Sequence, residues 1–172
     1  MQRRQFIIQA GGIAGALMVM GPSVLAHPVD NNINLGPLKK EHDEWSKLVS
    51  NQEFDILFEE GTEPPGSSAL NHVKKDGTFI CAACYLPLFE FDTKYESGTG
   101  WPSFYDAIAG RVGTKLDLKL IWPRKEYHCI RCGGHQGHIF EDGPKPTGLR
   151  YCNNGLALKF IPVDQPLPEL RG

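Results

Sequence analysis

Two matched cysteine motifs constrain this chain more than any other feature of its sequence. Cys81 and Cys84 form one Cys-x-x-Cys motif, and Cys129 and Cys132 form a second. Four thiolates in two such motifs have the number and spacing that complete a tetrahedral zinc site. Such a closed site leaves no position for substrate, so we expect one Zn²⁺ that stabilises the fold. Two disulfides and a thioredoxin-like redox pair are the alternatives that the spacing leaves open.

The rest of the sequence predicts a mainly β domain around that metal site. Apolar residues spaced among charged ones predict one or two short amphipathic helices near the N-terminal end, over residues 38–51 and 53–58. Beyond them, apolar or alternating runs bounded by turn residues predict short strands. These runs cover residues 78–80, 86–91, 115–122, 127–129 and 156–161.

The first 26 residues carry the pattern of an export signal. Arg3 and Arg4 form a twin-arginine pair before a weakly hydrophobic stretch, and a small residue, Ala26, stands where a signal peptidase cleaves. We therefore expect a twin-arginine (Tat) signal peptide over residues 1–26 and a periplasmic mature protein over residues 27–172. We expect no stable membrane association after cleavage. An uncleaved anchor is the alternative, but the stretch is short and glycine-rich for a spanning helix.

Charge and length bound the partners and the organisation of the mature protein. The formal net charge is −2, so the chain lacks the basic footprint of a nucleic-acid-binding protein. The residues that follow the signal suit a single domain, and no repeat or low-complexity tract divides them. We expect this domain to be a monomer.

A fifth cysteine, Cys152, remains after the zinc set is complete and is the candidate nucleophile. On a strand, Arg150, Cys152 and Asn154 would point to the same side. An ordinary thiol with a pKa near 8.5 is only about 3% thiolate at pH 7. We expect Arg150 and a nearby imidazolium to lower that pKa. The alternative is that Cys152 is a small buried hydrophobic residue.

Two histidines, His135 and His138, follow the second cysteine motif three positions apart. The glycines around them predict a loop whose backbone approaches a ligand closely. A second metal site is the alternative, since His-x-x-His can chelate. Trp101 lies in another glycine-rich turn, where it either contacts a ligand or fills the core.

Together these segments closely resemble the B-type peptide-methionine (R)-S-oxide reductases. The resemblance covers residues 38–162 and is carried by three runs: KYESGTGWPSF at residues 94–104, GHQGHIF at residues 134–140 and DGPKPTGLRYCNN at residues 142–154. It implies two small antiparallel sheets with short N-terminal helices, and a zinc remote from the active site. It also implies reduction of the R epimer of methionine sulfoxide in oxidised proteins, which repairs them.

The resemblance assigns a role to each candidate residue. Cys152 matches the cysteine that attacks the sulfoxide sulfur and becomes a sulfenic acid. His135 and His138 match the histidines that bind and protonate the sulfoxide oxygen. Asn154 matches an asparagine that orients the site, and Arg150 an arginine that helps to lower the thiol pKa. The pocket for the ε-methyl group of the substrate matches Trp101 and Phe140.

The sequence departs from the family at Thr99, where many relatives carry a resolving cysteine. With four cysteines on zinc and one in the active site, none remains for an internal disulfide. We therefore expect a one-cysteine mechanism, in which an external thiol or a thioredoxin-like partner reduces the sulfenic acid of Cys152. Asn153 and Gly155 replace an aliphatic residue and a serine of many relatives, and these departures leave substrate fit, not catalysis, open.

Two rival functions use the same residues. In a zinc-ribbon interaction module, the cysteine motifs would present a peptide-binding edge and Cys152 would be inert. In a thiol hydrolase or acyltransferase, Cys152 and a histidine would act together with an oxyanion hole. Rapid alkylation of Cys152 at pH 7 would argue against the first rival, and epimer-specific sulfoxide reduction would argue against both.

Overall fold

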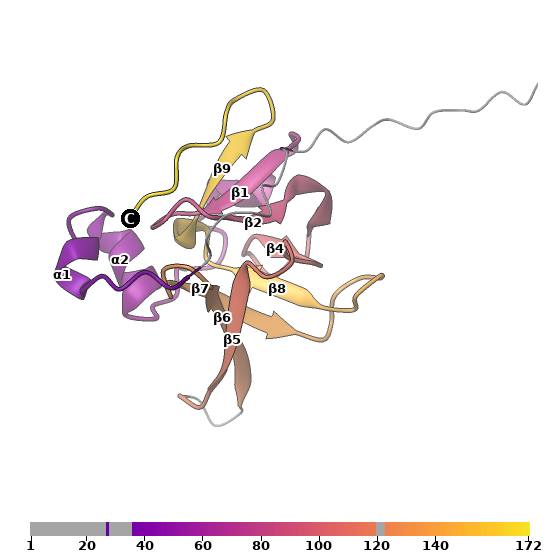
Figure 1. The fold of residues 1–172 in the computed structure, drawn as a ribbon. Helices are drawn as coiled ribbons and strands as arrows, with labels where there is room; N and C mark the ends of the chain where they lie inside the picture. Colours follow the sequence, from indigo (N-terminus) through magenta and orange to yellow (C-terminus); the bar gives the residue numbers. More distant parts are fainter. Residues whose placement is uncertain (1–26, 28–35, 120–122) are drawn as a thin grey trace, which may run out of the picture.

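Two antiparallel sheets make up most of the chain in the computed structural model, which describes residues 27, 36–119 and 123–172 (Figure 1). The smaller sheet has the order β2-β1-β9, with strands Pro87–Glu90, Gly77–Cys81 and Leu158–Pro162. The larger has the order β3-β4-β8-β7-β6-β5, with strands Lys94–Tyr95, Ser103–Phe104, Arg150–Asn153, His135–Phe140, Arg124–Cys129 and Val112–Asp117. The predicted fold class is confirmed. The expected signal peptide lies outside the described residues.

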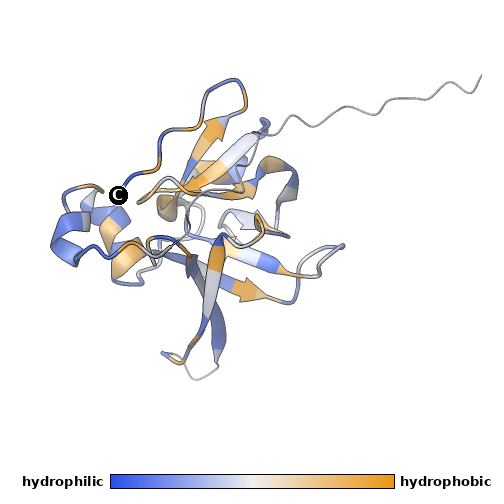
Figure 2. Cartoon of the chain, viewed as in Figure 1, coloured by the Kyte–Doolittle hydropathy of each residue, from blue (hydrophilic) through white to orange (hydrophobic). Residues whose placement is uncertain are grey.

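Two short helices precede the sheets, as predicted, but their bounds follow the capping residues. Helix α1 covers His42–Trp45 and α2 covers Asn51–Phe58. The Ser50 hydroxyl accepts from the Glu53 N–H at 3.2 Å, and the Glu53 carboxylate accepts from the Ser50 N–H at 2.8 Å. This capping box starts α2 at residue 51 because it satisfies donors that have no partner within the helix. In Figure 2, α1 is mostly hydrophilic, whereas hydrophobic residues colour part of α2 and much of β9.

Aromatic side chains join the two sheets in the core. Phe104 of β4 stacks on Phe89 of β2, with ring centroids 4.2 Å apart, and meets Phe79 of β1 edge-on at 4.9 Å. All three side chains are buried. Such pairs stabilise beyond the apolar area that they bury. The packing fixes β4, and with it the neighbouring strand β8, relative to the smaller sheet.

Residues 134–140, predicted to form a loop, instead contain the central strand β7. Gly137 lies opposite Asn153 of β8. A Cβ atom at Gly137 would lie 1.9 Å from the carbonyl oxygen of Cys152. Because Gly137 has no Cβ atom, strands β7 and β8 can approach each other closely.

The remaining strand predictions hold with shifted ends. The described part of the run 115–122 ends its pairing at Asp117, and residues 155–157 form the 3₁₀ helix η3 before β9 begins. None of the helices within the described residues has the length and apolar character needed to cross a membrane.

Candidate metal centre and active site

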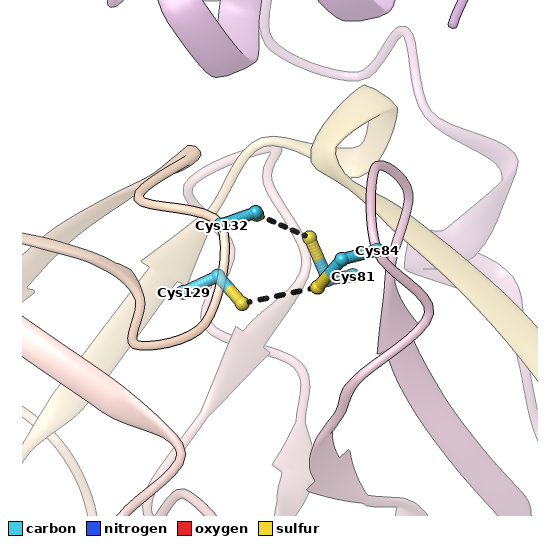
Figure 3. A group of neighbouring side chains, drawn as sticks. All are labelled: Cys81, Cys84, Cys129 and Cys132. Carbon is cyan, nitrogen blue, oxygen red and sulfur yellow. Dashed lines mark hydrogen bonds between the residues drawn. The ribbon is translucent and has the colours of Figure 1, made fainter. Parts of the chain in front are cut away.

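The four cysteines of the two Cys-x-x-Cys motifs meet in one buried cluster (Figure 3). The Sγ atoms of Cys81 and Cys132 are 3.6 Å apart, and those of Cys84 and Cys129 are 3.5 Å apart. All four sulfurs lie within 4.8 Å of one another. A tetrahedral zinc with Zn–S bonds of about 2.3 Å places its sulfurs about 3.8 Å apart, so the cluster fits such an ion. All four cysteines are free, which disagrees with the alternative of two disulfides.

Strand ends and neighbouring polar groups hold this cluster in place. Cys81 ends β1 and Cys129 ends β6, so the metal site ties the smaller sheet to the larger one. The Gly134 N–H points to the Cys132 sulfur at 3.4 Å, and the Gln136 amide to the Cys81 sulfur at 3.6 Å. Donors of this kind favour thiolates bound to a metal. Within the described residues, no second group of three or more histidine, cysteine or acidic side chains is close enough to hold an ion.

The pairing of β7 with β8 places His138 directly opposite Cys152. Residues opposite each other in an antiparallel pair share a face, with Cβ atoms about 4.5–5.5 Å apart. The other neighbour of Cys152 is Ser103 of β4. The strand pairing therefore places Cys152 and His138 side by side on two adjacent strands.

A β-bulge explains how His135 and His138 come together. On a regular strand, residues three apart point to opposite faces. The pairing of β6 with β7 shifts register between Tyr127 and His128, so that His128 lies opposite His135. This shift returns His135 to the face of His138, and their ring centroids are 5.5 Å apart.

The candidate residues do not all reach the same surface. Cys152, His138, Asn154, Trp101 and Phe140 line one hollow of about 120 Å³, together with three residues that were not among the predicted site residues: Thr62, Arg124 and Gly137. His135 and Arg150 do not line it. Both are buried, and they contact two residues that do: the rings of His135 and His138 have centroids 5.5 Å apart, and the Arg150 guanidinium lies 4.2 Å from the centre of the Phe140 ring.

The thiol of Cys152 is less acidic than the sequence led us to expect. Burial raises its pKa above the ordinary value, while the charge of Arg150 and hydrogen bonds from Thr99 and Arg150 lower it by less. Arg150 is itself paired with Asp142 through two hydrogen bonds of 2.7 and 2.8 Å. Arg150 lowers the pKa of Cys152, as expected, but burial raises this pKa by more.

His138 is held by a carboxylate on the next hairpin. Its Nε2 lies 2.8 Å from Oδ2 of Asp117, which also accepts from Arg124 at 2.7 Å. Burial lowers the pKa of His138, and the hydrogen bond to Asp117 raises it by less. The Lys119 N–H and His138 keep the pKa of Asp117 well below its usual range. Asp117 is therefore ionised, and His138 is neutral near pH 7.

His135 has a carboxylate partner of its own. Its Nδ1 lies 2.8 Å from Glu126, and both side chains are almost completely buried. Burial raises the pKa of Glu126. Interactions with His128 and His135 lower this pKa by more, so that it falls to about 2. Glu126 thus remains charged and fixes the orientation of the His135 ring.

Comparison with known proteins places this site in a family. The model of the SelR domain matches residues 49–162, which include the four clustered cysteines and every residue that lines the hollow. The chain belongs to the SelR family.

Several relatives of the SelR domain are named for one activity. "Peptide methionine sulfoxide reductase MsrB" of Methanosarcina barkeri is 49% identical over 124 residues, which cover 72% of this chain and 87% of the relative. The protein of the same name in Leptospira interrogans is 47% identical, over 72% of this chain and 95% of its own. "Peptide methionine sulfoxide reductase B1, chloroplastic" of Arabidopsis thaliana is 46% identical, over 71% and 61%.

Asn154 and Trp101 organise one wall of the hollow in this SelR domain. Asn154 follows β8 rather than lying on it, contrary to the expected strand. Its Oδ1 accepts from the Glu63 N–H at 3.2 Å, and its Nδ2 donates to the Gln136 carbonyl at 3.2 Å. The Trp101 Nε1–H donates to the Glu63 carbonyl at 3.0 Å. Asn154 therefore ties the segment that positions the Trp101 ring to β7.

Asn153, one of the two departures from the family near Cys152, does not line the hollow. Its side chain is buried on the opposite face, where its Oδ1 accepts from the Tyr127 hydroxyl at 2.6 Å. Its amide donates to Gln136 at 3.4 Å. Within this SelR domain, the polar residue at this position is matched by polar partners in the core.

Asp117, Glu126 and Arg124 were not identified from the sequence, although a signal for two of them was present. Arg124, Glu126 and His128 alternate along one strand, which places three polar groups on one face. The run that leads to Cys129 was interpreted only as the entry to the second cysteine motif.

Proposed function

We propose that this chain reduces the R epimer of methionine sulfoxide in oxidised proteins to methionine, as a repair enzyme. The observation that carries the proposal is the cross-strand pair of Cys152 and His138 within a hollow walled by Trp101 and Phe140. The names of the relatives, at 46–49% identity, describe reduction of peptide methionine sulfoxide. A nucleophile, a proton carrier and an apolar wall are the groups that this reaction needs.

The chemistry assigns a step to each of these groups. The thiolate of Cys152 attacks the substrate sulfur and forms an S–S bond, and the oxygen leaves that sulfur only when it is protonated, which an imidazole can do near neutral pH. The oxygen moves to the Cys152 sulfur as the S–S bond breaks, so the products are methionine and a Cys152 sulfenic acid. The thiol proton ends on the transferred oxygen. The substrate sulfur gains the two electrons that Cys152 loses.

The shape of the hollow accounts for the choice of epimer. A sulfoxide sulfur carries an oxygen, a methyl group, the rest of the side chain and a lone pair in a fixed order. Trp101 and Phe140 offer an apolar wall to the methyl group, and His138 offers a polar group to the oxygen. Only one epimer can satisfy both while it exposes its sulfur to Cys152.

We propose a one-cysteine cycle for the recovery of the enzyme. The position next to Cys152 is held by Thr99, whose side chain lowers the pKa of the thiol. A threonine cannot form a disulfide, so the sulfenic acid must be reduced by an external thiol or a thioredoxin-like protein.

The proposed metal is one structural Zn²⁺ on the four clustered cysteines. All four ligand positions are sulfur, so the ion would contribute its binding free energy to the fold and would leave the reaction to Cys152.

We also propose export of a monomer to the periplasm by the twin-arginine signal of residues 1–26. Replacing Arg3 and Arg4 with lysines should retain the protein in the cytoplasm, as measured by cell fractionation.

Separate incubation with the two epimers of a methionine sulfoxide peptide tests the proposed reaction. We expect reduction of the R epimer alone. Cys152→Ser should abolish it, because a hydroxyl is a far weaker nucleophile, and should leave zinc content and melting temperature unchanged. His138→Ala should slow the chemical step by roughly 10²–10⁴-fold. Reduction of neither epimer, or a wild-type single-turnover rate in Cys152→Ser, would refute the proposal.

A further inference from the structure

Arg124 reaches the active-site hollow from a strand that carries neither Cys152 nor His138. It lies on β6 and lines the hollow beside those two residues. Its Nη2 donates to Asp117, and 33% of its side-chain surface remains exposed. The guanidinium has five N–H donors, so it can also donate to an acceptor brought by a bound molecule.

Asp117 connects Arg124 to His138 through a single oxygen. Oδ2 of Asp117 is 2.7 Å from Arg124 Nη2 and 2.8 Å from His138 Nε2, and Oδ1 accepts from the Lys119 N–H at 2.9 Å. An ionised carboxylate only accepts hydrogen bonds, so His138 donates from Nε2. Its Nδ1 is then the nitrogen that can exchange a proton with Cys152 and the substrate.

Building on the proposed reduction of methionine sulfoxide, we propose that Arg124 is a further catalytic residue that donates a hydrogen bond from its guanidinium to the sulfoxide oxygen. Asp117 is the positioning residue that directs Arg124 and His138 to that oxygen. Arg124 is the one residue with a permanent charge among those that line the hollow in the described chain. Arg150, the other nearby cation, is paired with Asp142 outside it.

The proton and electron balance gives the two groups different tasks. His138 Nδ1 accepts the thiol proton of Cys152 and returns it to the oxygen as the bond between that oxygen and the substrate sulfur breaks. The S–S bond formed in the attack breaks as the oxygen bonds to the Cys152 sulfur, which loses two electrons as the substrate sulfur gains two. A guanidinium keeps its proton under these conditions. Arg124 therefore stabilises negative charge on the oxygen by its own charge and by hydrogen bonding, without giving up a proton.

Single-turnover reduction and thiol alkylation, measured side by side, test the role of Arg124. Reduction of the R epimer places an oxygen at the guanidinium, whereas alkylation of Cys152 by iodoacetamide brings no sulfoxide. We expect Arg124→Met to slow reduction by roughly 10²–10³-fold and alkylation by less than about tenfold. Arg124→Lys keeps the charge without the planar guanidinium, so its reduction rate should fall between those of wild type and Arg124→Met. Lys125→Met, an exposed change at the next position, is the matched control and should alter neither rate.

Three outcomes separate this assignment from the proposed function. If the wild type reduces the R epimer and Arg124→Met does so equally fast, the role of Arg124 is wrong and the proposed function stands. Equal losses in reduction and in alkylation would also overturn it, because they would indicate a displaced Cys152. A wild type that reduces neither epimer would overturn the proposed function and this assignment together.

The positioning role of Asp117 has a separate readout in the pH profile. The titratable and charged groups around His138 come from four strands: Asp117 of β5, Arg124 and Glu126 of β6, His135 of β7 and Cys152 of β8. In Asp117→Asn, the amide can donate to Nε2, so His138 would carry its proton on Nδ1 and could no longer accept the thiol proton. We expect both pH profiles, for alkylation and for reduction, to move to higher pH. An unmoved profile with uniformly lower rates would show a merely structural role.

Discussion

Burial and charge act in opposite directions on the Cys152 thiol. Arg150 and Thr99 both lower the pKa of Cys152, but burial raises this pKa by more. A thiol with a raised pKa is protected from casual oxidation until a base removes its proton. His138, opposite Cys152 and neutral because burial lowers its pKa, is placed to do so.

The first prediction concerns the pH at which Cys152 becomes reactive. Thiolate is the reactive form, so the rate of alkylation should rise with pH. It should reach half its maximum at a pH above the pKa of an ordinary thiol. Arg150→Met removes a cation that lowers this pKa and frees the Asp142 carboxylate, which raises it. The midpoint should therefore move further upward. Peptide mapping of alkylated Cys152 across pH measures it.

Lys47→Met serves as the control for this prediction. Lys47 is an exposed residue next to α1 that pairs with Asp43. Its substitution should leave the alkylation midpoint in place. A midpoint that falls in Arg150→Met would contradict the assigned electrostatics.

At the scale of elements, the site depends on how closely β7 and β8 approach. Gly137 allows the contact, since a Cβ there would overlap the carbonyl oxygen of Cys152. The bulge in β6–β7 then brings both histidines to one face. Strand spacing and register thus position the reacting groups.

A second prediction follows from this spacing. Gly137→Ala should separate β7 from β8 and destabilise the domain by about 2–4 kcal/mol. The rate of sulfoxide reduction should fall by a larger factor than the zinc content. Urea unfolding and metal analysis provide the two measurements. Ile139→Val on the same strand, a smaller change in a buried side chain, should retain most activity. Wild-type stability in Gly137→Ala would show that the strands separate without cost.

The loop between β3 and β4 suggests a third prediction, about recycling. The side chain of Thr99 lowers the pKa of Cys152, and Ser103 lies opposite Cys152 on the neighbouring strand. After one equivalent of substrate without reductant, wild-type Cys152 should be a sulfenic acid that dimedone labels. Thr99→Cys should instead yield a disulfide between the introduced thiol and Cys152 and lose the label, as mass spectrometry would show. A wild-type disulfide between Cys152 and a clustered cysteine, with zinc released, would contradict both the one-cysteine cycle and the structural role of the metal.

At the scale of the whole molecule, the four-cysteine cluster joins the two sheets. Structural zinc contributes roughly 10–16 kcal/mol in small peptides, whereas a domain has a net stability of about 5–15 kcal/mol. The cysteines end β1 and β6 and the turns that follow these strands. Loss of the ion should therefore affect the whole fold.

The last prediction tests that link. Cys84→Ser should lower zinc content and melting temperature together, the latter by about 10 °C or more, since each kcal/mol shifts a domain of this size by about 2–4 °C. Metal analysis and calorimetry on the same samples measure both. Cys152→Ser is the control, because it removes a cysteine outside the cluster. A metal-free protein with an unchanged melting curve would refute the structural role.

Features set by donor atoms and local patterns could be predicted from the sequence. Two Cys-x-x-Cys motifs predicted the cluster because ligand number and short spacing are local properties. The same holds for α2, whose start is encoded by Ser50 and Glu53. The motif around Cys152 identified a candidate nucleophile for the same reason.

Which of these residues meet, and with what acidity, depended on segments far apart in the chain. The sequence around His135 and His138 resembled a loop, because the partner that makes Gly137 necessary lies on β8. Asp117 and Arg124 reach His138 through the register of β5, β6 and β7, which no local pattern encodes. The raised pKa of Cys152 comes from burial by distant segments. The chemical groups and their local order are properties of the chain alone, whereas distances, strand register and burial arise only when remote residues come into contact.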